Sequence, residues 1–412
     1  MRTITRRQFG GLLAAAGAKP LRLFGAASLD ETLGDGARRR GIPAVVAMAA
    51  GIDKITYTGA FGKRDAKSGI AVNGDSIFRI ASMTKAITTT AAMQLVERGR
   101  LSLTAPAANY LPELGKLEVL EGFDNAGRPI LRPAKKQVEL RHLLTHTSGF
   151  VYPTWDEALA RYDKVTGHAA PPGAVAPLTP LAFEPGTQWQ YGTGIDWTGK
   201  LVEKASGLTL EQYFRRNILD PLGMKDTTFV FPEAKFDRLV STYRQQSGGS
   251  LREDPRTVPA APKEYNGGGG LFSTAPDYIR FMQMILRKGR GADGQRILSE
   301  ASVAMMSANQ IGPINVHRMK TTDPSVSADV DMHPGAADKY TFGFLMNPVA
   351  HEGGRSAGSL AWAGVENTFY WIDPRRGLCA VIMMQFFPFV DAKAMGMLSD
   401  FEKAVYASLA RA

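Results

Sequence analysis

Ser82 and Lys85 stand three residues apart at the start of a stretch with strong helical character. The run from 82 to 98 contains neither glycine nor proline, and Gly99 follows where a helix would end. In a helix that begins here, the hydroxyl and the amine share a face near the free N–H groups and the positive end of the dipole. Apolar residues surround both, so the helix is expected in the core. A lysine buried beside a serine costs free energy unless the two groups form an activated pair.

The chemistry that such a pair could perform is nucleophilic catalysis. A serine hydroxyl is a weak nucleophile until a base removes its proton. An ordinary lysine amine is almost entirely protonated at neutral pH, so burial and a second polar partner must shift that balance. The sequence therefore predicts a covalent intermediate on Ser82 and a polar partner for Lys85.

The elements that must position this pair come from both ends of the chain. Strand patterns occupy 44–49 and 55–61, and they return at 340–346, 359–373 and 378–385, before an amphipathic helix at 392–409. Helical and loop-rich sequence separates them, with long polar segments at 232–262 and 311–338. This order predicts an α+β fold: one antiparallel sheet from segments 28–80 and 338–412, flanked by N- and C-terminal helices, with a mostly helical subdomain at 81–337 inserted.

Three other stretches carry a resemblance to a known family. They are Leu143-Leu144-Thr145-His146-Thr147-Ser148-Gly149, Trp189-Gln190-Tyr191-Gly192-Thr193 and Gly267-Gly268-Gly269-Gly270-Leu271-Phe272-Ser273-Thr274. Together with Ser82-Met83-Thr84-Lys85, the S-x-x-K stretch, they resemble the class C-like branch of serine β-lactamases and penicillin-binding proteins. The resemblance runs from about residue 30 to the C-terminus. It implies a β-lactamase/transpeptidase-like fold and an enzyme that needs neither a cofactor nor a metal.

Two departures narrow the resemblance. Thr193 stands where the family's Y-x-N motif has asparagine, and Trp362-Ala363-Gly364 stands where it has Lys-Thr-Gly. This pattern is similar to family VIII carboxylesterases and related acyl-transferring enzymes. The missing lysine would meet a substrate carboxylate, whereas a tryptophan offers an apolar face that suits a neutral ester.

Roles for further residues follow from the resemblance alone. It assigns Tyr191 as the polar partner of Lys85, and leaves open which of the two is the base for Ser82. The oxyanion would lie between the backbone N–H of Ser82 and that of Val365, directly after Gly364, with Trp362 nearby. The expected function is hydrolysis of carboxylic esters of small or medium acyl chains. A β-lactamase, a D-amino-acid peptidase, an acyltransferase and a non-catalytic module that binds acyl compounds are the alternatives.

Composition bounds the partners and the location. The chain has 412 residues, 44% of them hydrophobic, and a net charge of +10. Its lysines and arginines are spread along the sequence without a block, so nucleic acid is not an expected partner. Cys379 is the single cysteine, which excludes an intrachain disulfide. Residues 1–27, with Arg6 and Arg7 before a weakly apolar run, resemble a twin-arginine export signal. A periplasmic or secreted protein without stable membrane insertion is expected, with a cytoplasmic one as the alternative.

Two other patterns are expected to be structural. Ser356 lies in a G-x-S-x-G match, but a strand pattern rather than a helix follows it and no histidine occurs after His351, so it is interpreted as a loop residue. His142 and His146 have the i, i+4 spacing of a helical zinc pair, without a companion glutamate. They are expected to close a helix rather than bind metal.

Overall fold

A computed structural model describes residues 26–168 and 177–409 of the chain. The twin-arginine prediction falls on residues outside these ranges and stays a prediction. Among the described residues, no helix combines the length and the apolar character needed to cross a bilayer.

A seven-stranded antiparallel sheet joins the two ends of the chain, as the sequence predicted. Its order is β2-β1-β13-β12-β11-β10-β9. The strands are β1 (Ala44–Gly51), β2 (Ile55–Gly62), β9 (Lys339–Tyr340), β10 (Leu345–Met346), β11 (Leu360–Gly364), β12 (Thr368–Asp373) and β13 (Leu378–Met383). β1 meets β13 in a register that sets Val46 against Met383 and Gly51 against Leu378. Both strands are buried along their length because helices cover both faces of the sheet.

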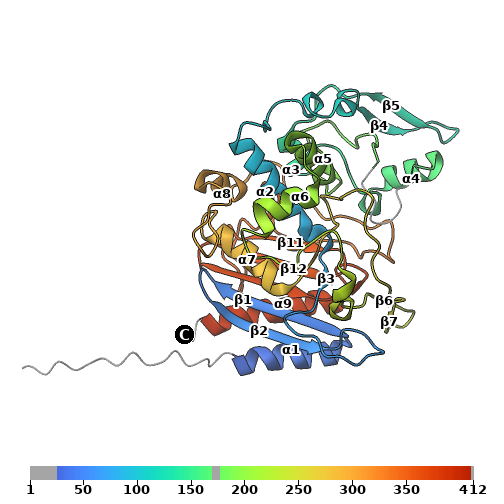
Figure 1. Ribbon diagram of the computed structural model, residues 1–412. Coiled ribbons are helices and arrows are strands. Elements are labelled where there is room, and N and C mark those ends of the chain that lie inside the picture. Colours follow the sequence, from blue (N-terminus) through green and yellow to red (C-terminus); the bar gives the residue numbers. More distant parts are fainter. Residues whose placement is uncertain (1–25, 169–176, 410–412) are drawn as a thin grey trace, which may run out of the picture.

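Three helices form the layers on the sheet. α1 (Ala26–Arg40) and α9 (Ala392–Leu409) pack against each other, and α1 also packs on β2. α7 (Ala275–Leu286) covers β1 and β13 from the other side (Figure 1). The layering confirms the predicted β-lactamase/transpeptidase-like class.

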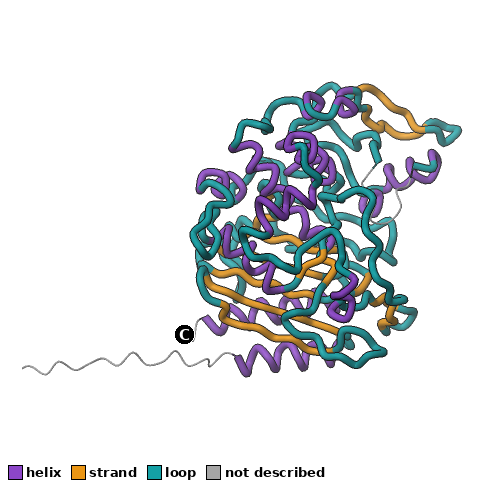
Figure 2. The backbone as a smooth tube through the Cα atoms, viewed as in Figure 1, coloured by secondary structure: helices purple, strands orange, loops and turns teal. Residues whose placement is uncertain are grey.

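The chain between β2 and β9 builds most of a second part of the molecule, which lies beside the main sheet and contains more helix than strand (Figure 2). α2 (Thr84–Glu97) runs through its centre and packs on α5 (Gly194–Ser206). The other helices are α3 (Leu140–Leu144), α4 (Glu157–Thr166), α6 (Leu210–Phe214) and α8 (Glu300–Met306). Small sheets pair β3 (Phe78–Arg79) with β8 (Phe272–Ser273), β4 (Glu118–Phe123) with β5 (Pro129–Pro133), and β6 (Tyr243–Gln245) with β7 (Leu251–Glu253) and β14 (Phe386–Phe387).

Two predicted strands are divided. The stretch 359–373 forms two antiparallel strands, β11 and β12, because the chain reverses at 365–367, where Asn367 has a φ of 66°. The stretch 340–346 reverses in the same way at Gly343, whose φ is 85°. The first reversal matters for function, since it places Val365 at the end of β11.

Candidate active site

Ser82 lies in a tight turn between β3 and α2. The turn is a 3₁₀ segment, Ala81–Met83, and Ala81 has a φ of 42°, a conformation that non-glycine residues rarely adopt. The antiparallel pair of β3 and β8 fixes the chain entering this turn. Ser82 lines a cavity of about 990 Å³. The nucleophile predicted from the sequence is thus partly accessible at the start of an otherwise buried helix.

Lys85 is fully buried, and each of its polar neighbours is an oxygen. Its Nζ lies 3.2 Å from Oγ of Ser82, 3.0 Å from the hydroxyl oxygen of Tyr152 and 2.6 Å from the carbonyl oxygen of Gly268. The structure therefore brings Ser82 and Lys85 together, as the helical spacing predicted. These three oxygens are enough to accept the three N–H bonds of an ammonium group whenever Lys85 carries a proton from Ser82.

Tyr152 was not singled out from the sequence, and it lies closer to Lys85 than Ser82 does. Its hydroxyl donates to Oδ2 of Asp196 at 3.0 Å. Burial, and then the neighbouring carboxylate of Asp196, hold the pKa of Tyr152 well above its ordinary value. Burial also raises the pKa of Asp196, although Lys85 and Tyr152 act in the opposite direction. Tyr152 is therefore held as a neutral phenol.

Tyr191 presents its ring to Lys85. The centre of the ring is 5.0 Å from Nζ, and the hydroxyl accepts a hydrogen bond from Nε1 of Trp362 at 3.4 Å. His146 packs against the same ring, with 4.8 Å between ring centres. Burial, with help from the charge of Lys85, lowers the pKa of His146 well below its ordinary value. Tyr191 therefore sits in a cage of neutral aromatic groups at the edge of the cavity that contains Ser82.

Trp362 contacts the ring of Tyr191, which also faces the amine of Lys85. Its indole packs on Tyr191, with 4.8 Å between ring centres, and it lines a separate cavity of about 130 Å³. It is not among the residues that line the large cavity with Ser82. The indole also packs against the rings of Tyr340 and His146.

The end of β11 presses against the segment that precedes Ser82. A Cβ added at Gly364 would lie 2.4 Å from the carbonyl oxygen of Ile80. Val365, the next residue, lines the large cavity together with Ser82. The two N–H groups predicted for the oxyanion site thus come from segments in direct contact.

Gln385 connects these two segments by side-chain hydrogen bonds. Its Oε1 accepts the backbone N–H of Arg79 at 2.9 Å, and its Nε2 donates to Oε2 of Glu366 at 2.6 Å. Arg79 lies three residues before Ser82, and Glu366 directly follows Val365. Burial raises the pKa of the Glu366 carboxyl, although the charge of Arg79 and the hydrogen bond from Gln385 act in the opposite direction.

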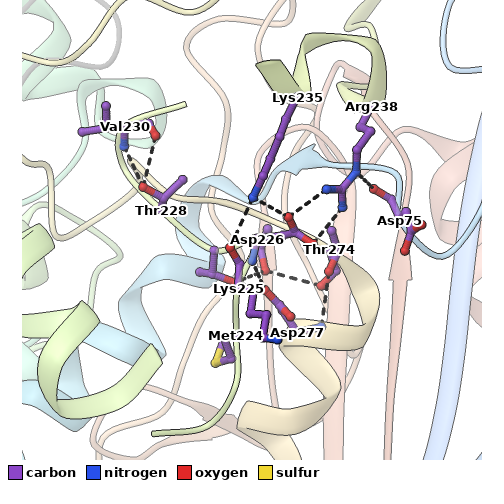
Figure 3. Close-up of polar contacts among 12 residues, drawn as sticks. Asp75, Met224, Lys225, Asp226, Thr228, Val230, Lys235, Arg238, Thr274 and Asp277 are labelled. Atoms are coloured by element: carbon purple, nitrogen blue, oxygen red, sulfur yellow. Dashed lines mark hydrogen bonds and ion pairs between the residues drawn. The ribbon is translucent and has the colours of Figure 1, made fainter. Parts of the chain in front are cut away.

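Phe229, Leu239 and Val240 form one wall of the large cavity. Asp226 secures this segment, since it binds Lys235 at 2.7 Å and accepts two hydrogen bonds from Arg238, at 2.9 and 2.7 Å (Figure 3). The backbone N–H of Asp226 donates to Asp277 of α7 at 2.7 Å, and Nε of Arg238 donates to the carbonyl of Asp75 at 2.9 Å (Figure 3). The ion pairs of Asp226 therefore tie the segment together, and the two hydrogen bonds hold it against α7 and the chain that leads to β3.

The remaining sequence candidates make structural hydrogen bonds. Ser356 is in the loop between β10 and β11, where its N–H donates to Asp373 at 2.9 Å. His142 accepts the N–H of Glu139 at the start of α3, and His146 accepts that of Gly192. Within the described ranges, no three His, Cys, Asp or Glu side chains cluster as metal ligands would.

Tyr152 and Asp196 are the polar neighbours that sequence reasoning missed. Tyr152 lies in an irregular segment, where no periodic pattern marks a side chain that points inward. Asp196 did give a signal, because it stands directly between the apolar residues Ile195 and Trp197. A carboxylate among buried apolar residues needs a specific partner.

Comparisons with known proteins agree with the fold. A sequence model of the beta-lactamase family matches residues 29–400. A monacolin J acid methylbutanoyltransferase of Aspergillus terreus is 34% identical, over 96% of this chain and 97% of its own. A lovastatin esterase of Penicillium rubens is 32% identical, over 87% of this chain and 92% of its own. The crystal-structure neighbour simvastatin synthase of Aspergillus terreus, a mutant form, superposes with a TM-score of 0.82 at 32% identity, covering 94% of this chain and 98% of the other.

Proposed function

The chain belongs to the beta-lactamase family, and from this premise we propose that it is a serine acyltransferase acting on carboxylic esters. It takes a small acyl group from an ester onto Ser82 and passes it to an alcohol, with water as a competing acceptor. The observation that carries the proposal is the contact between Oγ of Ser82 and Nζ of Lys85, 3.2 Å apart beside a large cavity.

The reaction divides into two acyl transfers. Oγ of Ser82 attacks the ester carbonyl carbon, and its proton passes to the base formed by Lys85 or Tyr191. The N–H groups of Ser82 and Val365 receive the oxyanion. The bond to the donor alkoxide breaks, and the base returns the proton to that leaving group. An acceptor alcohol then attacks the acyl-enzyme and gives its proton to the same base, which passes that proton to Oγ of Ser82 as the acyl–Oγ bond breaks.

Transfer to an alcohol is favoured over hydrolysis alone by the cavity and by the relatives. A volume of about 990 Å³ exceeds what a short acyl chain needs, and its wall contains Trp155, Phe229 and Phe272. Two of the relatives described above are named for acyl transfer and for ester cleavage. Hydrolysis, the main expectation from the sequence, becomes the competing reaction in this proposal.

The test measures where the acyl group goes. Purified protein is given p-nitrophenyl butyrate with increasing concentrations of a bulky apolar alcohol, and the butyrate ester and free butyrate are quantified. We expect the new ester to rise at the expense of butyrate, and the Ser82→Ala variant to form neither.

Ser356→Ala is the matched control and should behave like the wild type. Butyrate as the sole product at every alcohol concentration would replace transferase by esterase. An acyl adduct on Ser356, or faster turnover of a cephalosporin than of the butyrate ester, would contradict the proposal. An inert protein would favour the non-catalytic binding module.

A further inference from the structure

A closed ring of hydrogen bonds surrounds Lys85. The amine contacts the Tyr152 oxygen, and Tyr152 donates to Asp196. Asp196 accepts a hydrogen bond from the side chain of Asn266, and Oδ1 of Asn266 accepts the N–H of Gly268 at 2.7 Å. The carbonyl oxygen of Gly268 accepts a hydrogen bond from Lys85 at 2.6 Å, which closes the ring. Ser82 is the remaining polar contact of the amine, outside the ring.

The directions of these bonds fix the protons around Lys85. The carbonyl of Gly268 can only accept. The Tyr152 hydroxyl has one proton and donates it in a hydrogen bond to the carboxylate of Asp196. The Tyr152 oxygen is therefore an acceptor toward Lys85. A neutral Lys85 amine then donates its two N–H bonds to the oxygens of Gly268 and Tyr152. Its lone pair is left facing Oγ of Ser82.

We propose that Asp196 is a positioning residue that, through Tyr152, directs the lone pair of Lys85 at Ser82 and so makes Lys85 the base. This inference rests on the proposed acyl transfer through Ser82. The proton of Ser82 moves to Nζ of Lys85, and the resulting ammonium has three acceptors: the Ser82, Tyr152 and Gly268 oxygens. The leaving alkoxide then takes this proton. Asp196 touches none of the reacting atoms.

The packing around Asp196 is that of a site built for a carboxylate. Asp196 is 3% exposed, in the first turn of α5. A Cβ at Gly268 would lie 2.1 Å from its Oδ2, so a glycine is needed there for the carboxylate to keep this position. The same Gly268 also accepts a hydrogen bond from Lys85 through its carbonyl oxygen. The contact of Gly268 with both groups links the carboxylate to the amine.

The test uses the covalent reaction of Ser82 itself. The rate of labelling by a fluorophosphonate is measured from pH 5 to pH 10, so no ester substrate is needed. In Asp196→Asn the amide can donate to Tyr152 and turn its proton toward Lys85, where it competes with Ser82. We expect the plateau rate to fall roughly tenfold. Loss of the nearby negative charge should also move the midpoint of the pH profile to lower pH by about one unit.

The neutral groups facing this pair do not confuse the profile. They are Tyr152 before α4, Tyr340 on β9 and His146 after α3; the ring of Tyr191, before α5, also faces Lys85. Burial raises the pKa of Tyr152 and Tyr340 well above the ordinary value and lowers that of His146 well below it. A profile that moves on removal of Asp196 therefore reports the coupling of this carboxylate to the base.

Asp373→Asn is the matched control. Asp373 is also a buried carboxylate that accepts a tyrosine hydroxyl, from Tyr406 at 2.8 Å, and it lies at the end of β12 away from Gly364. We expect its profile to keep the wild-type midpoint. An unchanged midpoint in Asp196→Asn would overturn the proposal, because a structural role would lower the rate without moving the profile.

Tyr152→Phe keeps the proposal testable if Asp196→Asn does not fold. It removes the acceptor that ties Lys85 to Asp196, so the plateau rate should fall at least tenfold, and an unchanged plateau would refute the inference. Failure of the proposed function is distinguishable from both results. A wild-type protein that is labelled on Ser82 but transfers no butyrate would contradict acyl transfer and leave the labelling profiles decisive. Absence of labelling on Ser82 would refute both.

Discussion

Replacing Gly364 with alanine tests whether the end of β11 supplies part of the oxyanion site. The added Cβ would lie 2.4 Å from the carbonyl oxygen of Ile80 and 2.3 Å from Oγ1 of Thr368. The threonine side chain can rotate away. The carbonyl of Ile80 cannot, because it belongs to the backbone that leads directly into Ser82.

The structure sets the size of the expected effect. Unstrained carbon–oxygen contacts are about 3.4 Å, so β11 and the segment before Ser82 must separate by about 1 Å. The N–H of Val365 would then recede from hydrogen-bonding range, about 3 Å, to about 4 Å from the oxyanion. Loss of one oxyanion donor typically costs about 10²–10³ in kcat, or about 3–4 kcal/mol of transition-state stabilisation.

The assay is the burst of p-nitrophenol from p-nitrophenyl butyrate, which reports acylation of Ser82, together with the melting temperature. Gly51→Ala is the control, since Gly51 also ends a strand of the main sheet but a Cβ there would meet its nearest atom at 3.8 Å. We expect the Gly364→Ala burst rate to fall a hundredfold or more, with the protein still folded at the assay temperature. A near-normal burst rate in folded Gly364→Ala protein would refute the reasoning, because it would show that Val365 does not contact the oxyanion.

Three further results are expected. Tyr191→Phe should keep most of kcat, because Lys85 is the proposed base and the ring that faces its amine is retained; a loss of about a hundredfold would return the proton transfer to the Tyr191 hydroxyl. Trp362→Phe should lower kcat for the butyrate ester a few-fold with little change in KM, since the indole N–H bonds to Tyr191 rather than lining the large cavity; a change in KM alone would contradict this. Burial raises the pKa of Glu402, but the charge and hydrogen bonds of Arg355 outweigh it and hold that pKa well below the ordinary 4.5. The pair therefore stabilises the fold above about pH 4.5 and loses this contribution as the pH falls further. Glu402→Gln should lower the free energy of unfolding at pH 7 by about 3 kcal/mol, and the melting temperature with it. The melting temperature of this variant should decline less steeply below about pH 4.5 than that of the wild type; an equal decline in both proteins would show that other carboxylates cause it.

The sequence by itself determined the features that depend on local spacing. Ser82 and Lys85 share a face because three residues correspond to most of one helical turn, whatever surrounds the helix. The hairpin of β12 and β13 and the covering helix α9 follow from alternation, turn residues and helical period in the same way. The position of Tyr191 beside Lys85 and of Val365 beside Ser82 came from the family resemblance rather than from periodicity.

Tertiary structure alone decided what surrounds the amine. Tyr152 and Gly268 reach Lys85 from 67 and 183 residues along the chain. No local pattern encodes such a contact, because a loop side chain has no fixed period and its direction is set by the elements packed around it. The same holds for Trp362, whose strand position was predicted but whose indole turns toward Tyr191, because an aromatic cage lies on that side. The local sequence pattern determines which residues lie on the same helix or strand. Packing between distant elements determines which of their groups form hydrogen bonds with one another.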